Sequence, residues 1–231
     1  MGAVQARIEA ANKMKNVRAV LLMPVDYCER TILAARSAGL DLKVSHATNL
    51  KSLNAAVKIN QDLLLSFGSS TIVPSHILKI PGLIALNVHS ASPDYPGRDP
   101  HHFAVYEREN KYGATLHYMT PTVDAGPIVD VEIFDVDKNA TPYELLSKAN
   151  DAGWVLLERF FKSYSEHGVP DPNANLHWGE RRTTRKMFEQ MCCINVDMSR
   201  EEIELRIRAT EMPGYNNLYV LIHGYKFRIE Q

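Results

Sequence analysis

The stretch VRAVLLMP, residues 17–24, decides the fold class of this 231-residue chain. It is a continuous apolar run of strand length, which is typical of a strand buried on both faces of a sheet. Further strands are expected at 42–47, 62–68 and 82–89, separated by helices at 28–39 and 50–60 and by a short helix that Pro74 opens. This alternation predicts right-handed crossovers and a largely parallel sheet.

The second half of the chain continues this pattern with a change of direction. A helix is expected at 99–109, and strands at 113–120 and 127–136 have so short a connection that they should be antiparallel neighbours. Thr141-Pro142 predicts the start of a long helix at 142–167. The fold class is therefore α/β, with an open, mostly parallel Rossmann-like sheet and an antiparallel edge.

The end of the chain reads as a separate, smaller part. A basic turn at 179–186 precedes a helix at 199–210, where Ser199 and Glu202 have capping-box spacing, and a hairpin at 217–231 turns near Gly224. The sequence thus predicts an N-terminal extension (1–16), a main domain (17–168) and a small C-terminal helix and hairpin subdomain (169–231).

Charge and composition exclude several classes of partner. The formal net charge is −1, and residues 171–231 hold nine Lys/Arg against nine Asp/Glu, whereas a nucleic-acid site needs a basic face. No apolar run approaches the length of a membrane span. Three cysteines without a CxxC spacing indicate reduced thiols. We expect a cytoplasmic protein with no nucleic-acid or membrane partner.

Polar chemistry is concentrated in NVHSASPDYPGRDPHH, residues 87–102, beyond the expected strand at 82–89. Asn87 and His89 are two residues apart, so their side chains leave the same face and two hydrogen-bond donors converge. Asp124, in a later loop, is a candidate third member that orients the imidazole or relays a proton. No serine or cysteine is clearly paired with a base, which favours acyl transfer to a nucleophile that a substrate supplies.

Residues 86–130 resemble the catalytic core of the 10-formyltetrahydrofolate-dependent formyltransferases. The resemblance rests on Asn87-Val88-His89, the loop Pro93 to Gly97, Gly113-Ala114-Thr115 and Asp124-Ala125-Gly126, in order, and extends in outline over 17–165. It implies that Asn87, His89 and Asp124 form a catalytic triad. Asn87 and protonated His89 would then stabilise an oxyanion, and Asp124 would hold the proton arrangement that this requires.

The resemblance also implies a co-substrate, N10-formyltetrahydrofolate. Its pterin would lie along residues 66–73 and 120–124, and the implied contacts are Ser70, Thr71, Ile72 and Val123. Arg98 and His101 are candidate contacts to the acceptor, although Arg98 also reads as a salt-bridged loop residue and His101 as the solvated start of a helix. His117 reads as a core histidine, although the resemblance implies that its family counterpart can lie near the active site. No metal is expected, because the adjacent His101 and His102 diverge.

For the acceptor, the resemblance favours an amino group on a nucleotide-linked aminodideoxy sugar, a precursor of bacterial surface polysaccharides such as O-antigen. Family members of this branch carry a small C-terminal subdomain, so we expect a homodimer. Two departures, Ser90 in place of proline and a loop one residue shorter, change the wall near the acceptor. The alternatives are glycinamide ribonucleotide or methionyl-tRNA as acceptor, hydrolysis of formyltetrahydrofolate, or a non-catalytic binding module.

Overall fold

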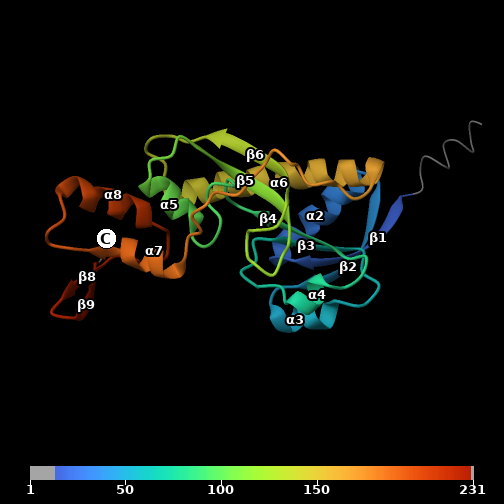
Figure 1. Cartoon of the computed structure of the whole chain (residues 1–231), viewed down its shortest axis with the longest axis horizontal. Coiled ribbons are helices and arrows are strands. Elements are labelled where there is room, and N and C mark those ends of the chain that lie inside the picture. The colour runs from blue at the N-terminus through green and yellow to red at the C-terminus, as the bar shows by residue number, and fades with distance from the viewer. Residues whose placement is uncertain (1–13, 230–231) are drawn as a thin grey trace, which may run out of the picture. The chain divides into compact units, whose positions relative to one another are not determined.

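The computed structural model describes residues 14–229, and its central feature is a six-stranded sheet in the order β2-β1-β3-β4-β5-β6 (Figure 1). Residues 1–13 of the predicted N-terminal extension lie outside the described residues. The four parallel strands are β1 (Lys15–Leu22), β2 (Leu40–Ala47), β3 (Leu63–Phe67) and β4 (Ile84–His89). The predicted strands are confirmed, with β1 and β2 starting two residues earlier than expected.

The helices between these strands follow local signals. They are α2 (Val25–Ser37), α3 (Leu50–Ala56) and α4 (Ser75–Leu78). Asn49 caps α3 in a reciprocal box with Ser52. Helix α3 is shorter than the expected 50–60, because Val57 is already extended. Its Leu53 packs with Val20 and Leu64 in one apolar core.

Strands β5 (Lys111–Tyr118) and β6 (Ile128–Asp135) form the antiparallel edge. The Tyr118 N–H donates to the Pro127 carbonyl (2.9 Å), and the Val136 N–H donates to the Asn110 carbonyl (2.9 Å). These two bonds join opposite ends of the strands, so β5 and β6 are antiparallel, as predicted. The Met119 N–H donates to the Ala85 carbonyl (2.9 Å), in line with the position of β5 beside β4 in the sheet.

Helix α6 (Pro142–His167) has the predicted bounds. The Thr141 hydroxyl accepts from the Glu144 N–H (3.3 Å), and the Glu144 carboxylate accepts from the Thr141 N–H (2.8 Å). Two orphan donors of the first turn are satisfied in this way. No helix among residues 14–229 combines the length and apolarity that crossing a membrane requires.

The chain divides into two compact units, which are described separately. The first comprises residues up to His89, Leu116–Asp130 and Trp154–Leu176, and the second comprises Ser90–Thr115, Val131–Gly153 and His177 onward. Strands β5 and β6 and helix α6 each contribute to both units. The boundary that the sequence predicts at residue 168 stays a prediction.

The second unit contains the C-terminal elements. They are α5 (Pro100–Tyr106), α7 (Arg185–Met191), α8 (Arg200–Thr210) and a small sheet of β7 (Cys193–Ile194), β8 (Tyr219–Ile222) and β9 (Tyr225–Arg228). Ser199 caps α8, as predicted. The predicted hairpin is confirmed, and its turn residues His223 and Gly224 both have positive φ. Helix α7 was not expected from the basic run.

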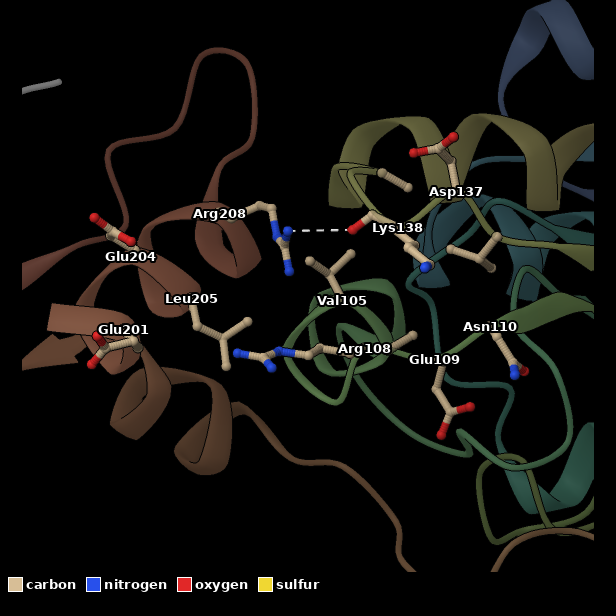
Figure 2. A pocket seen from close by; sticks show the side chains of 13 residues that line it. Val105, Arg108, Glu109, Asn110, Asp137, Lys138, Glu201, Glu204, Leu205 and Arg208 are labelled. Atoms are coloured by element: carbon tan, nitrogen blue, oxygen red, sulfur yellow. Dashed lines mark hydrogen bonds between the residues drawn. The ribbon is translucent and has the colours of Figure 1, made fainter. Parts of the chain in front are cut away.

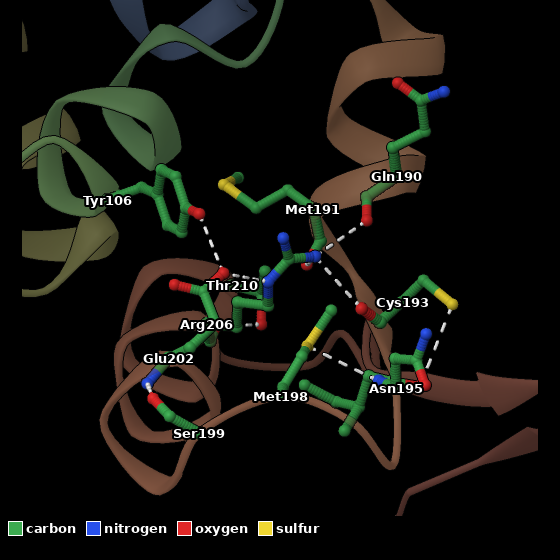
Figure 3. Close-up of polar contacts among 11 residues, drawn as sticks. Tyr106, Gln190, Met191, Cys193, Asn195, Met198, Ser199, Glu202, Arg206 and Thr210 are labelled. Carbon is green, nitrogen blue, oxygen red and sulfur yellow. Dashed lines mark hydrogen bonds and ion pairs between the residues drawn. The ribbon is translucent and has the colours of Figure 1, made fainter.

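Arg206 on α8 joins three elements of this unit (Figure 3). Its Nη1 donates to three carbonyls at the end of α7 and the start of β7, those of Gln190 (2.9 Å), Met191 (3.1 Å) and Cys193 (3.0 Å). Its Nε pairs with Glu202, which also accepts from the Tyr106 hydroxyl on α5 (2.8 Å). One guanidinium therefore gives a charged donor to three carbonyls around the end of α7.

Replacement of Arg206 tests this role. Arg206→Met should lower the free energy of unfolding by about 3 kcal/mol, because it removes the cation that pairs with Glu202 and the charged donor that three carbonyls share. Arg200→Met is a matched control on the same helix, since Arg200 also pairs with a glutamate four residues on but is 87% exposed, against 16% for Arg206. The control should cost less than about 0.5 kcal/mol. Equal losses in urea unfolding would contradict the assignment.

Candidate active site

Strand β4 delivers the first two candidate residues. Asn87 and His89 are the first and last of its final three residues, and Asn87 pairs in register with Ser66 of the buried strand β3. The carboxyl ends of parallel strands meet at one edge of a sheet, and open α/β folds bind ligands there. The amide and the imidazole that were predicted to converge at this edge are therefore both carried by a paired strand of the sheet.

The loop between β5 and β6 delivers the third. Asp124 has a left-handed backbone (φ 45°), a conformation that aspartate tolerates better than most residues. Its side chain is only 5% exposed. A buried carboxylate requires charged or hydrogen-bonding partners, so the groups around Asp124 indicate the role of this carboxylate.

Two histidines flank the Asp124 carboxylate. The Nδ1 atom of His89 lies 3.6 Å from Oδ2, and the Nε2 atom of His117 lies 3.5 Å from Oδ1. The structure therefore brings the predicted Asn87, His89 and Asp124 into one cluster in the first unit. It also adds His117, which the sequence indicated as a core histidine whose family counterpart can lie near the active site.

His117 connects the amide to this cluster. Its Nδ1 lies 2.9 Å from the Tyr118 carbonyl, and its Nε2 lies 3.1 Å from Nδ2 of Asn87. A carbonyl only accepts, so Nδ1 donates to that of Tyr118, while the Asn87 Nδ2, which carries N–H donors, faces Nε2. His117 thereby fixes the orientation of Asn87. The pairing of β5 with β4 was the signal that would have revealed this neighbour.

Gly126 keeps the same carbonyl in place. A Cβ atom at residue 126 would lie 1.8 Å from the Tyr118 carbonyl oxygen, the acceptor for His117. Only glycine allows this close backbone approach. The Asp-Ala-Gly segment thus combines the buried carboxylate of Asp124 with a glycine that lets the Tyr118 carbonyl, at the end of β5, approach closely.

The predicted pterin contacts lie on two loops of the first unit. Ser70, Thr71 and Ile72 follow β3 beyond Gly68, which has positive φ, and the Thr71 N–H donates to the Ser69 hydroxyl (3.2 Å). Ile72 is 67% exposed, and Val123, directly before Asp124, is 45% exposed. Two apolar side chains are thus presented to solvent on the loops that the sequence singled out.

The loop after β4 belongs to the second unit and is held by the segment 177–184. The Gly179 N–H donates to the Pro93 carbonyl (2.9 Å), and the Arg98 N–H donates to the Thr183 carbonyl (3.0 Å). The Thr183 hydroxyl donates to the Arg98 carbonyl (2.7 Å). A Cβ atom at Gly97 would lie 2.3 Å from the Thr183 carbonyl oxygen, which accounts for the glycine there.

The remaining predicted contacts, Arg98 and His101, also lie in this unit. The Arg98 Nε donates to the Asp99 carboxylate (3.3 Å), and the His101 ring lies 4.5 Å from the His102 ring. Their role toward an acceptor stays a prediction. Within residues 14–229, no group of three or more His, Cys, Asp or Glu side chains is arranged to hold a metal ion.

Comparisons with known proteins concern the family and the fold of the chain. The sequence model of the formyl transferase family matches residues 23–159. The methionyl-tRNA formyltransferase of Bacillus thuringiensis (strain Al Hakam) is 33% identical over 102 residues, which are 44% of this chain. That match spans 32% of the relative, so the chain aligns with only about a third of its length.

Solved structures share the fold over nearly the whole chain. A 4-N formyltransferase from Francisella tularensis has a TM-score of 0.74 at 19% identity, covering 95% of this chain and 98% of that one. An N-formyltransferase from Helicobacter canadensis, in complex with folinic acid and dTDP-3-aminofucose, has a TM-score of 0.68 at 18% identity, covering 91% and 86%. The family match extends over more than half of the sequence and includes the whole cluster around Asp124, so the chain belongs to the formyl transferase family.

Proposed function

We propose that the chain transfers a formyl group from N10-formyltetrahydrofolate to the amino group of a nucleotide-linked aminodideoxy sugar. The observation that carries the proposal is the cluster in which Asp124 lies between His89 and His117, with Asn87 bonded to His117. These groups come from separate parts of the sequence and meet at the carboxyl edge of a parallel sheet.

In this proposal the substrate amine is the nucleophile, and the protein stabilises the charge that develops on the formyl oxygen. An asparagine amide has two N–H donors, and His117 accepts from one of those of Asn87. The second donates to the oxyanion together with the protonated imidazole of His89. The Asp124 carboxylate, 3.6 Å from His89, stabilises the positive imidazole and relays the proton that the amine loses to N10 of the folate. The bond between N10 and the formyl carbon then breaks, and tetrahydrofolate leaves.

The folate supplies the formyl group, and the chain offers a matching surface for its flat ring. Ile72 and Val123 present exposed apolar side chains on the two loops near the cluster. Backbone groups around Ser70 and Thr71 provide the donors and acceptors for the polar edge of a pterin. These assignments follow from the sequence resemblance and fit the exposure of the loops.

A sugar nucleotide as acceptor is supported by the fold shared over 91% of the chain with the N-formyltransferase that was solved in complex with dTDP-3-aminofucose. Arg98 and His101 are the proposed acceptor contacts. The proposal includes a cytoplasmic homodimer that acts in O-antigen synthesis. Its interface is the C-terminal hairpin, where Tyr225 and Phe227 are exposed. Light scattering of the purified protein tests whether the chain is a dimer.

Methionyl-tRNA is the second candidate acceptor, because the relative with 33% identity is a methionyl-tRNA formyltransferase. The experiment is to incubate the protein with formyl-folate and each of several acceptors: dTDP-, GDP- and UDP-linked amino sugars, glycinamide ribonucleotide and methionyl-tRNA. Formylation of a sugar nucleotide supports the proposal. Formylation of methionyl-tRNA alone, or tetrahydrofolate release without any acceptor, contradicts it.

The triad can be tested by replacing its charged members. His89→Asn and Asp124→Asn should each lower kcat by about two orders of magnitude, because each removes a group that stabilises charge or transfers a proton in the transition state. His76→Asn is the control, since His76 is an exposed histidine on α4. Turnover near the wild-type value in either triad variant would refute the assigned roles.

The role of His117 is one of positioning. His117→Leu should lower kcat by about tenfold, because Asn87 loses the acceptor that orients its amide. His117→Gln should recover part of this loss, since its side-chain oxygen also accepts from an amide. A purely structural role would predict equal activity in the two variants after correction for the folded fraction, which circular dichroism measures.

A further inference from the structure

The second unit has a hollow that the proposed reaction does not use. It has a volume of about 730 Å³, within the range of small-molecule sites, and lies among α5, the loop after β6 and α8 (Figure 2). Its floor is apolar and includes the buried Ala104, Val105 and Ala140. Leu205 on α8 adds apolar surface beside the floor.

Three cations line this hollow: Arg108, Lys138 and Arg208. The Arg208 Nη1 donates to the Lys138 carbonyl (3.3 Å), but its Nε is buried and has no hydrogen-bond partner among residues 14–229. Arg108 and Lys138 are exposed and form no hydrogen bond or ion pair within the same described part of the chain, although Arg108 interacts electrostatically with Glu202. A buried donor without a partner is costly, so the Arg208 Nε favours an acceptor that the chain itself does not supply.

The backbone of Arg108 is a second, independent observation. Arg108 has φ 56° at the residue after the C-cap of α5, where its N–H donates to Val105 and the Glu109 N–H donates to Ala104. This is the Schellman position, which favours glycine because an L side chain is strained there. An arginine held in a strained conformation at the rim of a hollow indicates a role for its side chain.

Four carboxylates also line the hollow, against three cations, but none of the four forms a hydrogen bond or ion pair with those cations among the described residues. Each accepts from a partner outside the lining: Glu204 from Arg200 (2.8 Å), Glu109 from the Tyr95 hydroxyl (3.1 Å), Asp137 from the Asn139 N–H (2.8 Å), and Glu201 from Ser199 and its own N–H. Figure 2 shows the guanidinium groups of Arg108 and Arg208 near Leu205 and Val105, whereas the carboxylates of Glu201 and Glu204 point away.

We propose that this hollow binds an organic phosphate of nucleotide size. Its phosphate accepts from Arg108 and Arg208, since planar guanidinium groups suit phosphate oxygens, and its flat apolar part lies over Val105 and Ala140. The site is separate from the cluster around Asp124 and does not depend on the proposed formyl transfer.

Adenosine monophosphate is the probe, titrated calorimetrically into the full chain. The wild type should bind it more tightly than adenosine or inorganic phosphate, because the hollow offers both charge and apolar surface. Arg108→Gly should weaken binding by at least about tenfold. The same variant should keep or raise Tm, because glycine relieves the strain. Arg185→Met removes an exposed arginine of the same unit and should change affinity by less than about twofold.

Three results would overturn the proposal. They are no binding to the wild type at millimolar concentrations, unchanged binding in Arg108→Gly, and an equal loss in Arg185→Met. Unchanged binding in Arg108→Gly would assign the nucleotide to another part of the chain. Turnover with formyl-folate, measured in parallel, should be unaffected by Arg108→Gly, so the failure of one proposal is distinguishable from the failure of the other.

Discussion

The buried carboxylate of Asp124 is the group on which the rest of the site depends. Taking a charge out of water is costly, and the surrounding groups must compensate for it. Here the imidazole of His89, at the end of β4, lies 3.6 Å from the carboxylate, and that of His117, on β5, lies 3.5 Å from it. The position of Asp124 thus links the parallel half of the sheet to its antiparallel edge, and the chemistry of the site lies where these two halves meet.

Backbone proximity explains the glycines of the motif that identified the family. Gly126 lies against the Tyr118 carbonyl, and a Cβ atom at Gly113 would lie 2.1 Å from the Glu132 carbonyl oxygen. Neither glycine contacts a substrate in this account. Each allows two strands to pair closely enough for the histidines and the carboxylate to meet, so the motif records packing as well as chemistry.

The sequence predicted what local patterns determine. The strand runs, the 142–167 helix with its Thr141 cap and the hairpin at Gly224 all follow from signals within a few residues. Helix α7 was not predicted from the sequence, because it is short and starts in a basic run. His117 escaped for a different reason: its partners, Asn87 and Asp124, are distant along the chain, and only the pairing of β5 beside β4 brings them together.

The backbone bonds between residues 93–98 and 177–184 have a consequence for how such proteins recombine. The carboxy-terminal tail supplies main-chain partners to the loop that follows His89, and Gly97 fits against Thr183 with no room for a side chain. A chimera that receives the tail of a relative without the matching loop loses the fit between these two segments. The two segments should therefore be exchanged together, although about eighty residues separate them in the sequence.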